Sequence, residues 1–223
     1  MKRGKTQKRV GGDNATQTVF VDTETAGIEL RRPIIQIAAI AVDADAEELE
    51  QFEVKIQFDE KRACKDALRK IHYRRAEWKR HAVPPNKAAW SFAAFLRRHA
   101  SVDVVGRDLK TFRVAQLAAH NAHFDGEFLR NWFDKLGLFL PASYRMLCTL
   151  QLAYWYFHEH PQLIAPDDYR LGTLCNYFGA PFSPHSAHEA LADVKATVGL
   201  YRAMRTDRSR SQHQTKAVLC TQC

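Results

Sequence analysis

Three strand-like segments follow one another near the start of this chain, with short connections between them. The apolar run TVFVD (18–22) predicts a buried strand, and PIIQIAAIAVD (33–43) predicts a second one, with Pro33 at its start where a missing N–H does least harm. In EQFEVKIQF (50–58) apolar and polar side chains alternate, which indicates a half-exposed strand. Short connections favour antiparallel neighbours, so we expect a three-stranded antiparallel meander.

Strand and helix patterns alternate through the rest of the chain. The expected elements are helices at 61–81 and 87–99, a strand at 114–120, a helix at 125–136, a strand at 144–148, and helices at 149–158, 171–178 and 188–204. Strands first, followed by strands and helices in alternation, predict a mixed α/β layer fold.

Size and composition predict a single folded unit. The chain has 223 residues, 46% of them hydrophobic, which is enough for one substantial core. We expect one domain over 16–205, which carries a basic helical arm at about 61–81. The flanking segments are expected to be disordered tails, one of them basic at 1–15 and the other at 206–223.

The sequence indicates a cytoplasmic protein with no membrane association. It has no run of 18 apolar residues, and its first residues, MKRGKTQKRV, lack the apolar segment of a secretory signal. Five scattered cysteines fit a reducing compartment. The terminal CTQC has the spacing of half a zinc site, but the sequence contains no partner pair, so we interpret it as part of the tail.

Positive charge is concentrated in the tails and in the arm. Residues 61–81 hold nine Lys or Arg against Asp66 and Glu77, and the formal net charge of the chain is +8. Such clusters attract polyanions, of which nucleic acid is the most common in a cell. For the tails alone, solubility is an equally good explanation.

Two acids close the first predicted strand. Side chains alternate along a strand, so Asp22 and Glu24 project from the same face a few ångströms apart. If both stay ionised, a divalent cation such as Mg²⁺ or Mn²⁺ is the partner that hard oxygen donors favour. The alternative is that Asp22 caps a turn and Glu24 is solvated.

Further acids lie at the start of two predicted helices. Asp125 is at the junction of a strand and a helix, where it either reaches a site at the sheet end or caps the helix. Asp193 flanks an apolar helical stripe, where an acid is costly unless it has a partner. His188 could converge with Asp193 from a loop or first turn, and SAHE (186–189) matches a capping box that would start the helix near Ser186. A histidine there is well placed for proton transfer, although a surface histidine is the more common case.

The segments DTET, HNAHFD and HEALAD, in this order, resemble the three motifs of the DEDDh family of DnaQ-like 3'–5' exonucleases. The resemblance spans about 18–204. It implies an RNase H-like three-layer α/β fold, in which helices flank a five-stranded mixed sheet with the first strand at its centre. It further implies that Asp22, Glu24, Asp125 and Asp193 bind two Mg²⁺ or Mn²⁺ ions, and that His188 is the general base. Thr25 would help to hold the terminal nucleotide, and Asn121 and Phe124 would shape its pocket.

The resulting functional hypothesis is a metal-dependent exonuclease acting on nucleic-acid 3' ends, with single-stranded or frayed DNA favoured and RNA as an option. A separate polymerase or repair protein is the expected partner. The alternative is a catalytically weak nucleic-acid-binding or polymerase-associated module on the same fold. The arm is more basic than the family pattern, and we expect Arg74, Arg75, Lys79 and Arg80 to track the backbone of a strand that enters the site.

Overall fold

The computed structural model describes residues 16–106, 108–184 and 188–220, with side chains through Asp207. Its centre is a five-stranded sheet with the strand order β3-β2-β1-β6-β7. The strands are β1 (Thr18–Thr25), β2 (Ile34–Val42), β3 (Glu48–Lys55), β6 (Leu117–Ala119) and β7 (Leu147–Cys148). β1 pairs with β2 in antiparallel and with β6 in parallel orientation, and β6 and β7 are parallel. The predicted mixed sheet with a central first strand is confirmed.

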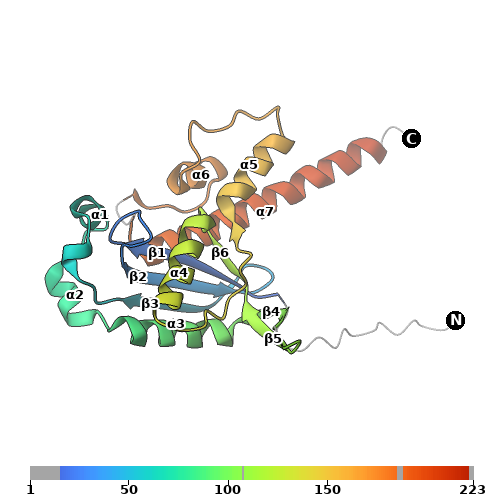
Figure 1. The fold of residues 1–223 in the computed structure, drawn as a ribbon. Helices are drawn as coiled ribbons and strands as arrows, with labels where there is room; N and C mark the ends of the chain where they lie inside the picture. The colour runs from blue at the N-terminus through green and yellow to red at the C-terminus, as the bar shows by residue number, and fades with distance from the viewer. Residues whose placement is uncertain (1–15, 107, 185–187, 221–223) are drawn as a thin grey trace.

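Helices cover both faces of this sheet and give the predicted three layers (Figure 1). α3 (Pro85–Arg98) and α4 (Ala122–Lys135) pack on one face, where Phe92, Phe95 and Phe128 meet Val19 and Val21 of β1. α7 (Ala190–Cys220) packs on the other face against Phe20, through Val194 and Val198. Because both faces are covered, every residue of β2 is buried.

α5 (Thr149–Glu159) and α6 (Leu171–Phe178) form a further cluster on α7. α7 begins at Ala190 and continues to Cys220, whereas the sequence predicted a helix at 188–204 followed by a disordered tail. No Gly or Pro occurs after Gly199, so nothing in the local sequence ends the helix there. None of the helices within the described ranges combines the length and hydropathy needed to cross a membrane.

The predicted strand at 114–120 is divided between two sheets. Its first residues end β5 (Thr111–Ala115), which forms a separate two-stranded sheet with β4 (Ala100–Val105), and its last residues form β6. The break occurs at Gln116, whose carbonyl accepts the N–H of Val19 and whose side-chain amide donates to the Arg145 carbonyl. The chain changes sheets there because its hydrogen-bonding partner changes from β4 to β1.

The basic arm also differs from the prediction, since it is not a continuous helix. It consists of a 3-10 turn at Glu60–Arg62 and two short helices, α1 (Lys65–Lys70) and α2 (Arg75–His81). His72 ends α1 in the left-handed region at φ 52°, and the Tyr73 N–H donates to the Leu68 carbonyl. Ile71 and Trp78 pack on Ile35, which places the arm beside the carboxyl end of β1 (Figure 1).

Candidate active site

The carboxyl end of β1 directs alternate side chains to opposite faces of the sheet. Val21 faces α3 and α4, whereas Phe20 faces α7, so the alternation sends Asp22 and Glu24 toward α7. Glu24 is only 9% exposed and Asp22 is partly buried. Neither acid is therefore a solvated residue in a turn beyond the strand, because β1 continues through Thr25.

Thr23, which lies between these two acids, joins the third acid to the strand. Its backbone N–H and its hydroxyl both donate to Asp125 Oδ1, at 2.9 and 2.7 Å. Asp125 is 3% exposed and lies inside α4, whose N-cap is Asn121 at φ 65°. The alternative that Asp125 caps this helix is therefore wrong.

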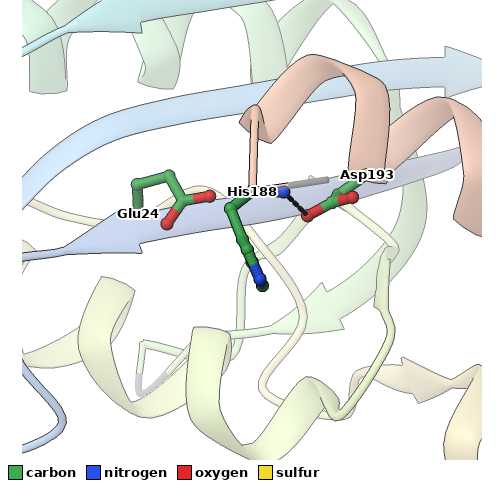
Figure 2. Close-up of side chains that lie close together, drawn as sticks. All are labelled: Glu24, His188 and Asp193. Atoms are coloured by element: carbon green, nitrogen blue, oxygen red, sulfur yellow. Dashed lines mark hydrogen bonds between the residues drawn. The ribbon is translucent and has the colours of Figure 1, made fainter. Parts of the chain in front are cut away.

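Asp193 lies on the α7 face of the sheet, opposite to the α4 face that carries Asp125, in the first turn of α7. The backbone N–H of His188 donates to Asp193 Oδ2 at 3.0 Å, with His188 in the left-handed region at φ 68°. Ligand atoms of Glu24, His188 and Asp193 all lie within 4.8 Å of one another, and Figure 2 shows His188 between the two carboxylates. The predicted helix start near Ser186 lies among residues 185–187, outside the described ranges, and α7 begins at Ala190.

Electrostatic interactions link the four acids. Burial and the nearby charges of Asp125, Glu24 and Asp193 raise the pKa of Asp22 well above its usual range. Burial and Asp193 raise the pKa of Glu24 to about 8. Burial raises the pKa of Asp125 to about 7, although hydrogen bonds from Thr23 oppose the shift, and burial also raises the pKa of Asp193. Four clustered carboxylates that resist ionisation fit hard divalent cations, which would stabilise their charged forms.

Two cavities flank this cluster. The first, which we call the β1-side cavity, has a volume of about 500 Å³ and is lined by Thr25, Gly27, Ile28, Lys70, Phe124 and His188. The second, the α5-side cavity, has a volume of about 720 Å³. Its lining includes Lys70, Asn121, Tyr154, Tyr169, His188 and Asp193. His188 and Lys70 line both cavities and therefore stand between them.

Comparisons with known proteins identify similar sequences and similar folds. Residues 93–201 match the RNase_T family model, described as exonuclease. A DNA polymerase III PolC-type from Caldanaerobacter subterraneus subsp. tengcongensis is 33% identical over 102 residues, which are 46% of this chain and 7% of that protein. The resemblance to DEDDh exonucleases is confirmed. The matched part of the chain thus resembles an exonuclease domain.

Solved structures of exonuclease I share the fold. The E. coli enzyme in complex with a dT13 oligonucleotide has a TM-score of 0.71 at 19% identity, covering 89% of this chain and 43% of that one. The zinc-bound form with single-stranded DNA has a TM-score of 0.70 at 19% identity, covering 87% and 42%. This chain thus spans under half the length of the exonuclease I chains. The RNase H-like fold predicted from the DEDDh motifs is confirmed.

Lys70 is a site residue that the DEDDh motifs do not indicate. Its charge opposes the raised pKa values of Glu24 and Asp193, and it also lowers the pKa of His188 after the larger effect of burial. The basic composition of the arm was the sequence signal for it. That signal pointed instead to residues further along the arm, because composition does not show which end of α1 meets the sheet.

Proposed function

We propose that this protein is a metal-dependent 3'–5' exonuclease of the DEDDh type. The observation that carries the proposal lies at the carboxyl end of the central strand, where ligand atoms of Glu24, Asp193 and His188 lie within 4.8 Å of one another. The charges of Glu24, Asp193 and Asp125 all raise the pKa of Asp22 there. These acids come from three segments of the chain and from both faces of the sheet. Burying several carboxylates close together destabilises a fold, and such clusters occur mainly at functional sites. A metal-dependent reaction explains why this chain keeps them.

The four carboxylates are the proposed ligands of two Mg²⁺ or Mn²⁺ ions. The charges of all three other acids raise the pKa of Asp22, so Asp22 is the residue best placed to contact both ions. When bound, such ions activate a water molecule and stabilise the departing 3' oxygen in phosphodiester hydrolysis. Thr23 orients Asp125 through two hydrogen bonds, which fixes one carboxylate oxygen and leaves the other available.

His188 is the proposed general base. Burial and the charges of Lys70 and His72 lower its pKa, so the ring is neutral near pH 7 and able to accept a proton from water. Its backbone is tied to Asp193 by the hydrogen bond at 3.0 Å, and a ring nitrogen lies within 4.8 Å of carboxylate oxygens of Glu24 and Asp193. His188 is therefore placed to remove a proton from a water molecule that attacks the scissile phosphate.

The β1-side cavity is the proposed pocket for the terminal nucleotide. Thr25 and Phe124 line it, as the family resemblance implies, and the Thr25 hydroxyl donates to the Gly27 carbonyl at 2.8 Å. Asn121, in contrast, lines the α5-side cavity. Lys70, at the junction of both cavities, is suited to bind the phosphate between two nucleotides as a point charge.

DNA with a single-stranded or frayed 3' end is the proposed substrate, with RNA as the second possibility. The exonuclease I structure with dT13 and the PolC-type relative support a nucleic-acid substrate. The same relative supports a polymerase or repair protein as partner, and another exonuclease I structure is a complex with SSB-Ct.

The direct test uses 5'-labelled single-stranded DNA, duplex DNA and RNA of one sequence, each with Mg²⁺, Mn²⁺ or chelator. We expect a ladder of products that keep the 5' label and shorten with time, and no products with chelator or with Asp22→Asn. Immediate release of labelled mononucleotide would contradict the 3'–5' direction. Binding without cleavage would favour the alternative, a nucleic-acid-binding module.

A further inference from the structure

The α5-side cavity lies across the acid cluster from the proposed terminal-nucleotide pocket. His188 and Asp193 line its inner end, and it is the larger of the two cavities, at about 720 Å³ against about 500 Å³. Cavities of this size hold ligands as large as a nucleotide. A phosphodiester joins two nucleotides, so a phosphate held between the cavities places one nucleotide on each side.

Two tyrosines give the α5-side cavity a flat aromatic wall. The rings of Tyr154 and Tyr169 are stacked, with centroids 4.2 Å apart and an interplanar angle of 13°. Tyr154 is 50% exposed although it lies on α5, in the aromatic run YWYFHEH, whose residues Tyr156 and Phe157 are buried core. An exposed aromatic ring beside a cluster of acids is not explained by core packing.

A partly buried histidine, His120, ties the backbone of this wall to α5. His120 Nε2 donates to the Tyr169 carbonyl at 3.0 Å, and its Nδ1 accepts from the Thr149 hydroxyl at 2.9 Å. The carbonyl can only accept, so this bond selects the ring tautomer. This bond fixes the backbone at Tyr169, and the Tyr169 ring packs between Tyr154 and the edge of Phe157, so the wall exists before any ligand arrives and less entropy is lost on binding.

We propose that the α5-side cavity binds the nucleotide on the 5' side of the scissile phosphate, with its base stacked on the Tyr154–Tyr169 pair. The proposal rests on the proposed exonuclease function. Every base has a π face, so stacking would hold this nucleotide without a sequence preference. Only an unpaired base can stack there, and so the last two nucleotides of a duplex must separate before cleavage.

The test is a double-mutant cycle that removes the Tyr154 ring from the protein and one base from the substrate, separately and together. Single-stranded oligonucleotides are prepared intact, with an abasic site at the terminal position, or with an abasic site at the penultimate position. Wild type and Tyr154→Ala are compared by kcat/KM on each substrate. Affinity is measured by the anisotropy of the same labelled oligonucleotides without metal.

For wild type we expect the penultimate abasic site to reduce kcat/KM and affinity roughly 5- to 150-fold. Tyr154→Ala should show the same loss on the intact substrate and no further loss on the penultimate abasic one. The terminal abasic site should affect both proteins equally, and Tyr154→Phe should retain wild-type values. Independent, multiplying losses for Tyr154→Ala and the penultimate abasic site would overturn the proposal.

Trp155→Ala is the matched control. Trp155 is the next residue of α5 and is 59% exposed, but it lines a different cavity with Phe20 and Tyr201. We expect it to keep the wild-type response to each abasic substrate. If no protein cleaves any substrate, the proposed function fails, whereas the anisotropy cycle still decides whether the base stacks on Tyr154.

Discussion

At the scale of single residues, the alternation of β1 explains the site. Thr23 faces α4 and holds Asp125, while Asp22 and Glu24 face α7 and meet Asp193. A strand can contact acids on both of its faces only at its end, where the neighbouring helices no longer cover it. The three consecutive side chains Asp22, Thr23 and Glu24 thus lie next to acids from the helices on both faces of the sheet.

Removal of one acid should abolish activity and leave the fold intact. We expect Asp125→Asn and Asp22→Ala each to reduce the rate of oligonucleotide cleavage by at least about 100-fold, since they remove a proposed metal ligand. Asp134→Asn is the control, because Asp134 is an exposed acid on the same helix. Circular dichroism checks the fold, and full metal-dependent activity of Asp22→Ala would refute the assignment.

The raised pKa of Glu24 predicts how stability depends on pH in the absence of metal. Its folded-state value of about 8 lies above the ordinary 4.5, so the folded state binds the proton more tightly than the unfolded state does. The melting temperature in chelator should therefore fall as pH rises from about 4.5 to 8. Glu24→Gln should remove part of this decline and melt a few degrees higher than wild type, roughly, at pH 8.5.

Calorimetric scans from pH 4.5 to 8.5, in chelator and in Mg²⁺, measure this effect. Bound cations stabilise the ionised acids, so Mg²⁺ should flatten the decline of wild type. A melting temperature that rises over this range in chelator would contradict the electrostatics of the cluster.

At the scale of elements, the cations of the basic arm differ in their surroundings. Lys70 ends α1 at the cavities, and Arg75 is already bound to Glu60. Among the described residues, Arg74, Lys79 and Arg80 form no ion pair. These three charges, rather than all four predicted from the sequence, are the ones available for a phosphate backbone.

The combined charge reversal Arg74→Glu, Lys79→Glu and Arg80→Glu should weaken binding of single-stranded DNA and flatten its salt dependence. Each lost phosphate contact reduces the slope of log K against log salt by about 0.7. The control is Lys87→Glu with Arg97→Glu, two exposed cations of α3. Anisotropy titrations from low to moderate salt measure the slope, and an unchanged slope would refute a role of the arm.

Trp78 anchors α2 of the arm to the sheet. It is 6% exposed, its Nε1 donates to the Ile35 carbonyl at 3.2 Å, and Lys55 lies over its ring. Trp78→Ala should lower the free energy of unfolding by about 3–5 kcal/mol, as expected for a large buried ring. Trp90→Ala, at a 55% exposed position of α3, should cost far less in the same urea titration. Equal losses would contradict the anchoring role.

At the scale of the whole molecule, metal binding should stabilise the fold, because its proposed ligands come from β1, α4 and α7. A divalent ion at 100 times its Kd adds about 2.7 kcal/mol, which raises the melting temperature of a chain this size by roughly 5–10 °C. Scans with Mg²⁺, Mn²⁺ and chelator measure the shift. Asp193→Asn should lose most of it, and an equal shift in that variant would place the metal elsewhere.

Local patterns in the sequence determined much of this protein. Alternating and continuous apolar runs indicated β1, β2 and β3, and helical stripes indicated α3 to α7, because each face is encoded within its own segment. The motifs DTET, HNAHFD and HEALAD indicated the acids and His188. Those predictions needed no knowledge of which segments become neighbours.

Only the tertiary structure decided what meets at the site. The division of 114–120 between two sheets depends on the pairing of β6 with β1, and the broken arm depends on the docking of Trp78 beneath β2. The position of Lys70 follows from that docking, as the exposed ring of Tyr154 follows from the packing of α5 on α7. Contacts between distant segments leave no periodic pattern in either segment, and this is why the sequence did not show them.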